Sequence, residues 1–92
     1  MYTISAELTF HIPHSDSLKD KRQIRRSTIE KTRHKFNVSI AEVATQDNHQ
    51  TLTIGIAVVS GEASHARNSI EEIIRYMENH TNAELFSVEI IE

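Results

Sequence analysis

The sequence contains no cysteine, a single proline and only two glycines. Without cysteine the chain can form no disulfide, no thiolate metal site and no covalent intermediate on a thiol. Two glycines are too few for a phosphate-binding loop, which needs several close together. No apolar run approaches the roughly 18 residues of a membrane-spanning helix, and the first residues alternate between polar and apolar instead of forming a signal-peptide core. These absences indicate a cytoplasmic protein with no membrane segment.

The rest of the composition is that of an ordinary globular domain, with 38% apolar and 25% charged residues among 92. A chain of this length forms one small core and has little room for a deep, enclosed active site. We therefore expect a single domain over residues 1–92.

Positive charge is concentrated in one segment. Residues 17–36 hold eight of the ten lysines and arginines and only two acids, although the whole chain carries a net charge of −3. From Glu62 onward, seven acids stand against two arginines. This asymmetry indicates either an acidic partner for the basic segment or attraction between the two halves inside the fold. The charge pattern alone leaves both explanations open.

The first half of the chain is typical of a strand followed by a helix. Residues 2–12 alternate strictly between apolar and polar, as in a strand with one buried face, and Pro13 ends the pattern. Ser17 is then a suitable N-cap, with Asp20 three residues later in the electropositive first turn. The helix should run to about Lys35, with a broad apolar arc toward the sheet. That arc contains Leu18, Ile24, Ile29 and Phe36.

The second half adds two strands, a helix and a last strand. Residues 38–46 form a strand whose apolar parity changes between Ile40 and Ala41, so we expect a β-bulge there. Residues 52–59 are apolar at nearly every position, which is typical of a central strand. Apolar residues at helical spacing predict a helix over residues 66–77. The last strand is marked by Phe86, Val88 and Ile90.

The order of elements is therefore β-α-β-β-α-β. Right-handed crossovers place both helices on one face of a four-stranded antiparallel sheet, which is the ferredoxin-like α+β fold. This fold hosts many unrelated functions, so the fold alone assigns none.

The loop after the first strand, residues 11–17, carries no recognisable catalytic or ligand-binding motif. It has no Cys-x-x-Cys pair, no glycine and no arginine. His11 and His14 are separated by a proline at a strand end, which argues against a ligand pair. Ser15 and Asp16 are better explained as turn and capping residues than as parts of a catalytic triad. We expect no catalytic residue, no metal, no cofactor and no small-molecule substrate, and hence no enzyme activity.

The face of the sheet opposite the helices should be flat and made of small and β-branched side chains. If the even residues of the first strand face the helices, its odd residues face outward, and His11 is the only aromatic ring among them. RNA-recognition motifs of this topology stack bases on aromatic residues of the sheet. Base stacking on this sheet is therefore disfavoured. The face suits packing against a second copy of the chain, which predicts a homodimer. Its central residues are Ser5, Thr9, Gly55 and Ala57.

The first helix carries a stripe of positive charge. At roughly 100° per residue, four basic residues fall within about 60° of one another beside the apolar arc, and at about 1.5 Å per residue they span about 21 Å. Such a stripe is long enough to face several phosphates, and arginine forks suit phosphate well. A charge-rich helix face can also be merely solvated, but such a face usually mixes both signs. We call Lys19, Arg22, Arg26 and Arg33 the basic stripe.

Lys21 and Arg25 differ from the basic stripe because their helical angles place them inside the apolar arc. We expect their stems to run along the sheet edge, with their charges emerging near the helix N-terminus. They are further candidates for nucleic-acid contact. The alternative is an ion pair with an acid from the acidic half of the chain.

Three stretches, HIPHSDSLKDKR, FNVSIAEV and LTIGIAVVSGEASHA, resemble the YlxP-like family, also known as DUF503. The most specific of them is the helix entry Ser-Leu-Lys-x-Lys-Arg at residues 17–22. The resemblance runs from end to end and implies the fold derived above, a bacterial protein and no established enzyme activity. Neighbouring genes in this family imply a role near RNA or the ribosome. Arg25, Thr28 and Thr32 stand where aliphatic residues are common in the family, which puts the packing of the first helix in question.

We therefore expect a non-enzymatic protein that contacts RNA or a ribosomal particle through its first helix. The alternative is a homodimeric interaction or regulatory module, in which the open sheet face or a free strand edge forms the dimer and the basic helix meets an acidic protein.

Overall fold

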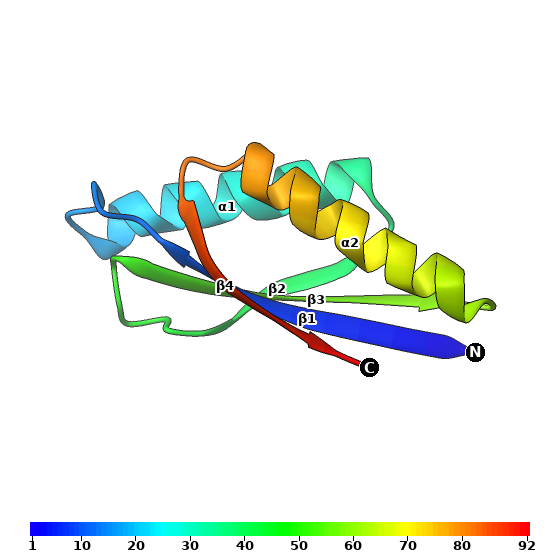
Figure 1. Ribbon diagram of the computed structural model, residues 1–92. Coiled ribbons are helices and arrows are strands. Elements are labelled where there is room, and N and C mark those ends of the chain that lie inside the picture. Colours follow the sequence, from blue (N-terminus) through cyan, green and yellow to red (C-terminus); the bar gives the residue numbers. More distant parts are fainter.

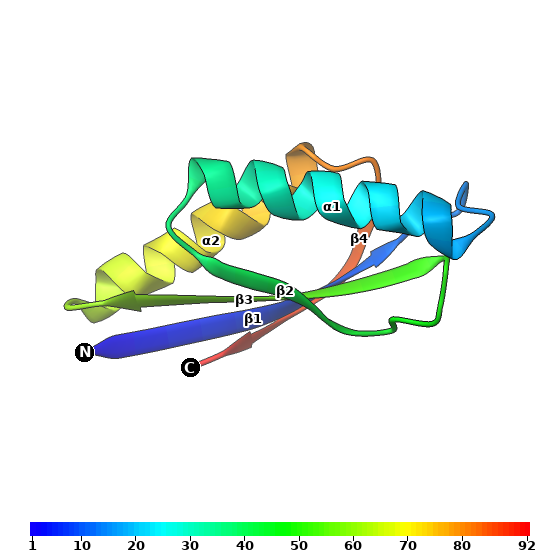
Figure 2. The same cartoon turned by 180° about the vertical axis from the view of Figure 1, so that it is seen from behind.

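The computed structural model describes residues 1–92, and its chain folds into two layers, a sheet and a pair of helices (Figure 1). The elements are β1 (Tyr2–His11), α1 (Leu18–Lys35), β2 (Ser39–Ala44), β3 (Thr51–Ser60), α2 (Ala63–Asn79) and β4 (Glu84–Ile91). All neighbouring strands are antiparallel, in the order β2-β3-β1-β4. Both helices cover the same face (Figures 1 and 2). The predicted ferredoxin-like arrangement is confirmed. Neither helix is long and apolar enough to cross a membrane.

The core lies between the sheet and α2. Even-numbered residues of β1 and of β3 point into it, and Leu8 and Ile54 have no exposed surface. The amphipathic pattern of α2 buries Ala66, Ile70, Ile73 and Met77 against β1 and β3. Fourteen buried apolar residues form this core, and none of them comes from α1.

The start of α1 follows its sequence signals. The hydroxyl oxygen of Ser17 accepts a hydrogen bond from the backbone N–H of Asp20 at 3.2 Å. The carboxylate of Asp20 accepts in return from the N–H of Asp16, one residue before the cap, at 3.2 Å. This reciprocal capping fixes where α1 begins.

The buried side of α1 is polar, which corrects the predicted apolar arc. Leu18 is 42% exposed, and the other members of that arc are only partly buried. The buried residues of α1 are Lys21, Thr28 and Thr32. The hydroxyl of Thr32 donates to the Thr28 carbonyl at 2.8 Å, and the Thr28 hydroxyl lies 2.8 Å from that of Thr81. Hydrogen bonds therefore replace much of the apolar packing that usually anchors a helix.

The β-bulge predicted between Ile40 and Ala41 is wrong in position. The register of β2 against β3 shifts between Glu42 and Ala44 instead. Ile40 is buried and Glu42 nearly so, while Ala41 between them is exposed. The inward parity of Ile40 continues to Glu42, because an acid occupies an inward position where the sequence pattern places only apolar residues. The parity changes at the register shift that follows, where Ala44 pairs with Thr53.

A second register shift lies in β4, where Thr9 pairs with Ser87 and Phe10 with Leu85. Phe86 is left without a partner and is 79% exposed. Val88 and Ile90 pair with inward-facing residues of β1, yet they are 39% and 46% exposed. Because α2 packs over β1 and β3, the helix layer leaves this part of β4 uncovered.

Candidate nucleic-acid interface

The basic stripe lies on the solvent side of α1. All four of its residues are exposed. Lys19, Arg22 and Arg26 take part in none of the ion pairs or side-chain hydrogen bonds of the structure. Cations with no internal acid keep their full charge and all their donors for a ligand.

Arg33 is tied to its own fold at the far end of the stripe. One of its guanidinium nitrogens donates to the Ile40 carbonyl of β2 at 3.3 Å. Because a guanidinium has five N–H donors, the remaining ones are still available. Arg33 therefore combines a structural contact with an exposed charge.

Lys21 does not reach solvent, so the expectation that its charge emerges near the helix N-terminus is wrong. The residue is only 2% exposed. Its ammonium donates to the backbone carbonyls of Thr45 and of Asn48, the latter at 2.8 Å, and lies 2.8 Å from Oε2 of Glu42. With three oxygen partners around it, this ammonium has no donor left for a nucleic acid.

Arg25 shares the same acid. Its guanidinium lies 3.2 Å from Oε1 of Glu42, and its side chain is 34% exposed. Oε2 of Glu42 makes no well-directed hydrogen bond, so Lys21 holds that oxygen as an ion pair. We call Lys21, Arg25 and Glu42 the Glu42 cluster. The cleft beside it has a volume of only about 50 Å³, too small for a ligand.

The internal acid thus comes from β2 and not from the acidic half of the chain. The remaining ion pair, between Arg67 and Glu92, joins two residues of the acidic half itself. No ion pair connects α1 to residues 62–92. Direct pairing between the two halves therefore does not explain the charge asymmetry, and the basic stripe is left uncompensated.

Sequence reasoning missed Glu42 and Thr45 as the partners of α1. Thr45 has a φ of 62°, in the left-handed region that β-branched residues rarely adopt. Its hydroxyl accepts from the N–H of Thr53 at 3.1 Å, and its carbonyl receives the Lys21 ammonium. The one available signal was an isolated acid within an otherwise apolar strand. No three histidine, aspartate or glutamate side chains are placed to hold a metal ion.

The fold and sequence both have known relatives. The solution NMR structure of the de novo designed protein LFR1 1, with a ferredoxin fold, superposes with a TM-score of 0.60 at 18% identity, covering 100% of this chain and 87% of the designed one. The uncharacterized protein YlxP of Bacillus subtilis (strain 168) is 30% identical over 79 residues, 86% of each chain. The sequence profile described as "Protein of unknown function (DUF503)" matches residues 3–90. The chain therefore belongs to the DUF503 family.

Proposed function

We propose that this protein is a non-catalytic, cytoplasmic RNA-binding domain that contacts the phosphate backbone of RNA, free or in a ribosomal particle, through α1. The observation that carries the proposal is the row formed by Lys19, Arg22 and Arg26, which are exposed and have no acidic partner. An acidic protein that leaves these charges uncompensated gains nothing in stability from placing them together. A polyanion along α1 supplies the missing counter-charge.

The positions of these cations favour phosphates over bases. They lie along a straight helix, spaced by one turn from Arg22 to Arg26, and so follow a chain of regularly spaced charges. Arginine forks bind phosphate oxygens in pairs. Contacts of this kind fix position and not sequence, so we expect similar affinity for RNAs of different sequence.

Fluorescence anisotropy with a labelled RNA hairpin tests the proposal. Arg26→Glu should weaken binding by roughly tenfold or more, since a charged hydrogen bond is lost and a repulsion is introduced. The matched control is Arg75→Glu, the same charge change at an exposed position of α2 in the acidic half. Equal affinities of the two variants for the hairpin would contradict a role for α1.

A homodimer through β4 is the second candidate, and we favour this free strand edge over the open face, the other dimer surface expected from the sequence. Glu7 and Glu89 lie directly opposite each other across β1 and β4 on the open face, where like charges disfavour self-packing. At β4, in contrast, Val88 and Ile90 are exposed on a free edge strand of eight residues. Edge strands of this kind readily pair with another chain.

Light scattering at high protein concentration tests this second candidate. We expect about twice the mass of one chain for the native protein, and the mass of one chain for Ile90→Ser. Because Ile90 is remote from α1 in the sheet order, Ile90→Ser should bind the RNA hairpin as the native protein does. A single-chain mass for the native protein would rule out the dimer.

A further inference from the structure

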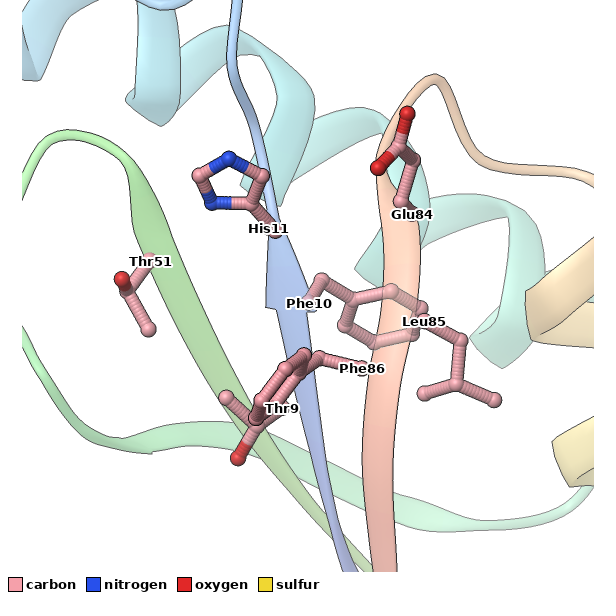
Figure 3. A pocket seen from close by; sticks show the side chains of 7 residues that line it. All are labelled: Thr9, Phe10, His11, Thr51, Glu84, Leu85 and Phe86. Atoms are coloured by element: carbon pink, nitrogen blue, oxygen red, sulfur yellow. The ribbon is translucent and has the colours of Figure 1, made fainter.

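A hollow on the open face lies where β1 ends and where β3 and β4 begin (Figure 3). Its volume of about 390 Å³ is at the small end of the range for ligand pockets, about 300–1,000 Å³. Three strands contribute to its lining, which combines three apolar side chains with four polar ones. The lining residues are Thr9, Phe10, His11, Thr51, Glu84, Leu85 and Phe86.

The register shift in β4 directs Phe86 to this hollow. As the extra residue between Leu85 and Ser87, Phe86 has no cross-strand partner. Its ring extends from β4 toward β1, and Phe86 lines the hollow together with Thr9 (Figure 3). A bulge that redirects a side chain is frequent beside functional sites. With 79% of its surface exposed, Phe86 contributes little to the fold and presents one aromatic face to solvent.

Polar groups form a row beside this ring. His11 is the cross-strand partner of Thr51 on β3 and of Glu84 on β4. A hydroxyl, an imidazole and a carboxylate thus stand side by side on the open face, across three strands (Figure 3). The row supplies hydrogen-bond donors and acceptors at the end of an aromatic platform.

We propose that this hollow binds one unpaired nucleobase, stacked on Phe86 with its polar edge toward His11, Thr51 and Glu84. An aromatic face with adjacent hydrogen-bonding groups is how single-stranded RNA bases are recognised. The carboxylate of Glu84 accepts hydrogen bonds and donates none, so it favours a base edge with adjacent N–H donors, as in guanine, over uracil. The sequence argument against stacking on this sheet did not place Phe86 on the open face.

This inference rests on the proposed function for the source of the base. The loop from residue 12 to residue 17 leads directly from His11 to the start of α1, and α1 begins at the end of the sheet where β1 ends and β3 begins (Figure 2). An RNA strand held at Lys19 and Arg22 reaches the hollow, which lies on the opposite face, by passing around this end of the sheet. The same base chemistry is present in a free nucleotide, and the two sources are separated by experiment.

The experiment compares three ligands on the full chain: a short oligouridine with one central guanosine, plain oligouridine of equal length, and guanosine monophosphate. Amide NMR shifts report where each binds. We expect the guanosine oligonucleotide to bind most tightly and to shift the amides of Thr51, Glu84 and Phe86. Tight binding of guanosine monophosphate alone would identify a free nucleotide as the source of the base.

Phe86→Ala should weaken binding of the guanosine oligonucleotide roughly 5- to 150-fold, the loss of one stacked base. Phe86→Trp should retain it. Glu84→Gln should reduce the preference for guanosine over uridine. Tyr2→Ala is the matched control, an exposed aromatic residue at the opposite end of β1, and it should bind as the native protein does. Because Phe86 is exposed, these variants should keep the native amide spectrum.

Unchanged affinity of Phe86→Ala, or amide shifts that miss the hollow, would overturn the base pocket. If Arg26→Glu still weakens RNA binding in that case, the contact through α1 stands without the pocket. If the hairpin binds but no single strand or nucleotide does, the pocket is likewise excluded. Absence of binding to any of these ligands contradicts both proposals.

Discussion

Nζ of Lys21 lies 2.8 Å from Oε2 of Glu42, and both side chains are buried, with 3% and 7% of their surfaces exposed. The pair joins α1 to the edge strand β2. Burying two charges is unfavourable unless further hydrogen bonds satisfy them. Here two backbone carbonyls accept from Lys21 and Arg25 donates to Oε1 of Glu42, while Oε2 is held by the ion pair alone. Lys21 thereby also holds the carbonyl of Thr45, whose φ is 62°. The lysine is a structural residue that fixes the β2–β3 turn.

Replacement of Lys21 should therefore destabilise the fold strongly. In Lys21→Met, Glu42 becomes a buried carboxylate paired only with the half-exposed Arg25, so we expect the free energy of unfolding to fall by about 3–5 kcal/mol. Urea denaturation followed by circular dichroism measures the loss. Lys19→Met is the control, because Lys19 lies two residues earlier on α1 and is exposed. It should change the free energy of unfolding by no more than about 0.5 kcal/mol.

The double variant Lys21→Met/Glu42→Leu separates the ion pair from the turn contacts. Removing the Glu42 carboxylate left without Lys21 should restore a large part of the free energy of unfolding that Lys21→Met loses. If Lys21→Met and the native protein had the same denaturation midpoint, a structural role for the buried charge would be disproved.

Gly55 is required for space and not for its backbone conformation. No glycine of the chain has a positive φ, but a Cβ at Gly55 would lie 2.8 Å from Cγ1 of Val43. Since the branched valine side chain is stiff, Gly55→Ala should lower the free energy of unfolding by about 1–3 kcal/mol. Thermal denaturation of Val43→Ala/Gly55→Ala should show recovery. A double variant as unstable as Gly55→Ala would contradict this steric explanation.

Thr32 offers a stabilising change. It is 1% exposed, and its hydroxyl only donates back to the carbonyl of Thr28 within the same helix. Thr32→Val replaces this hydroxyl by a methyl group in the same space, so we expect a gain of about 1 kcal/mol and a rise in Tm of about 4–8 °C. Thr28→Val is the control, because it removes the partner of the Thr81 hydroxyl and should bring no such gain. Equal effects at both positions would disagree with this account.

Salt dependence tests how many cations face phosphates. If the four residues of the basic stripe each neutralise one phosphate, log affinity should fall against log salt with a slope of about −3, since each contact releases about 0.7 to 0.9 of a counterion. Arg26→Ala should make the slope less negative by about 1, whereas Lys21→Met, if folded, should leave it unchanged. A slope near zero for the native protein would indicate that binding, if any, does not depend on the stripe.

The fold was predictable because the apolar residues of its core recur at the regular spacings of strands and helices. Leu8 and Phe10 alternate with polar residues along β1, and Ile70 and Ile73 recur at helical spacing along α2, and all four are buried. These patterns depend only on neighbours in the sequence. The exposure of Lys19, Arg22 and Arg26 follows from the same helical geometry.

The missed features all depend on contacts between distant segments. Glu42 points inward only because Lys21, far from it in sequence, meets it there. Phe86 lies on the open face only because β4 shifts its register against β1. A pattern of residue types treats an acid as outward and a strand as regular, so neither exception can be seen before the elements are packed together.

The absence of α1 from the apolar core separates the stability of the helix from that of the rest of the protein. Local opening requires only that the contacts of one element break, and those of α1 are a few hydrogen bonds, the Glu42 cluster and partly buried side chains such as Ile24 and Ile29. The sheet and α2 keep their shared core when these are lost. The surface that carries the basic stripe therefore belongs to a less firmly held unit than β1 and β3. We expect the amide hydrogens of α1 to exchange sooner than those of β1 and β3, and to become more protected when a polyanion binds α1.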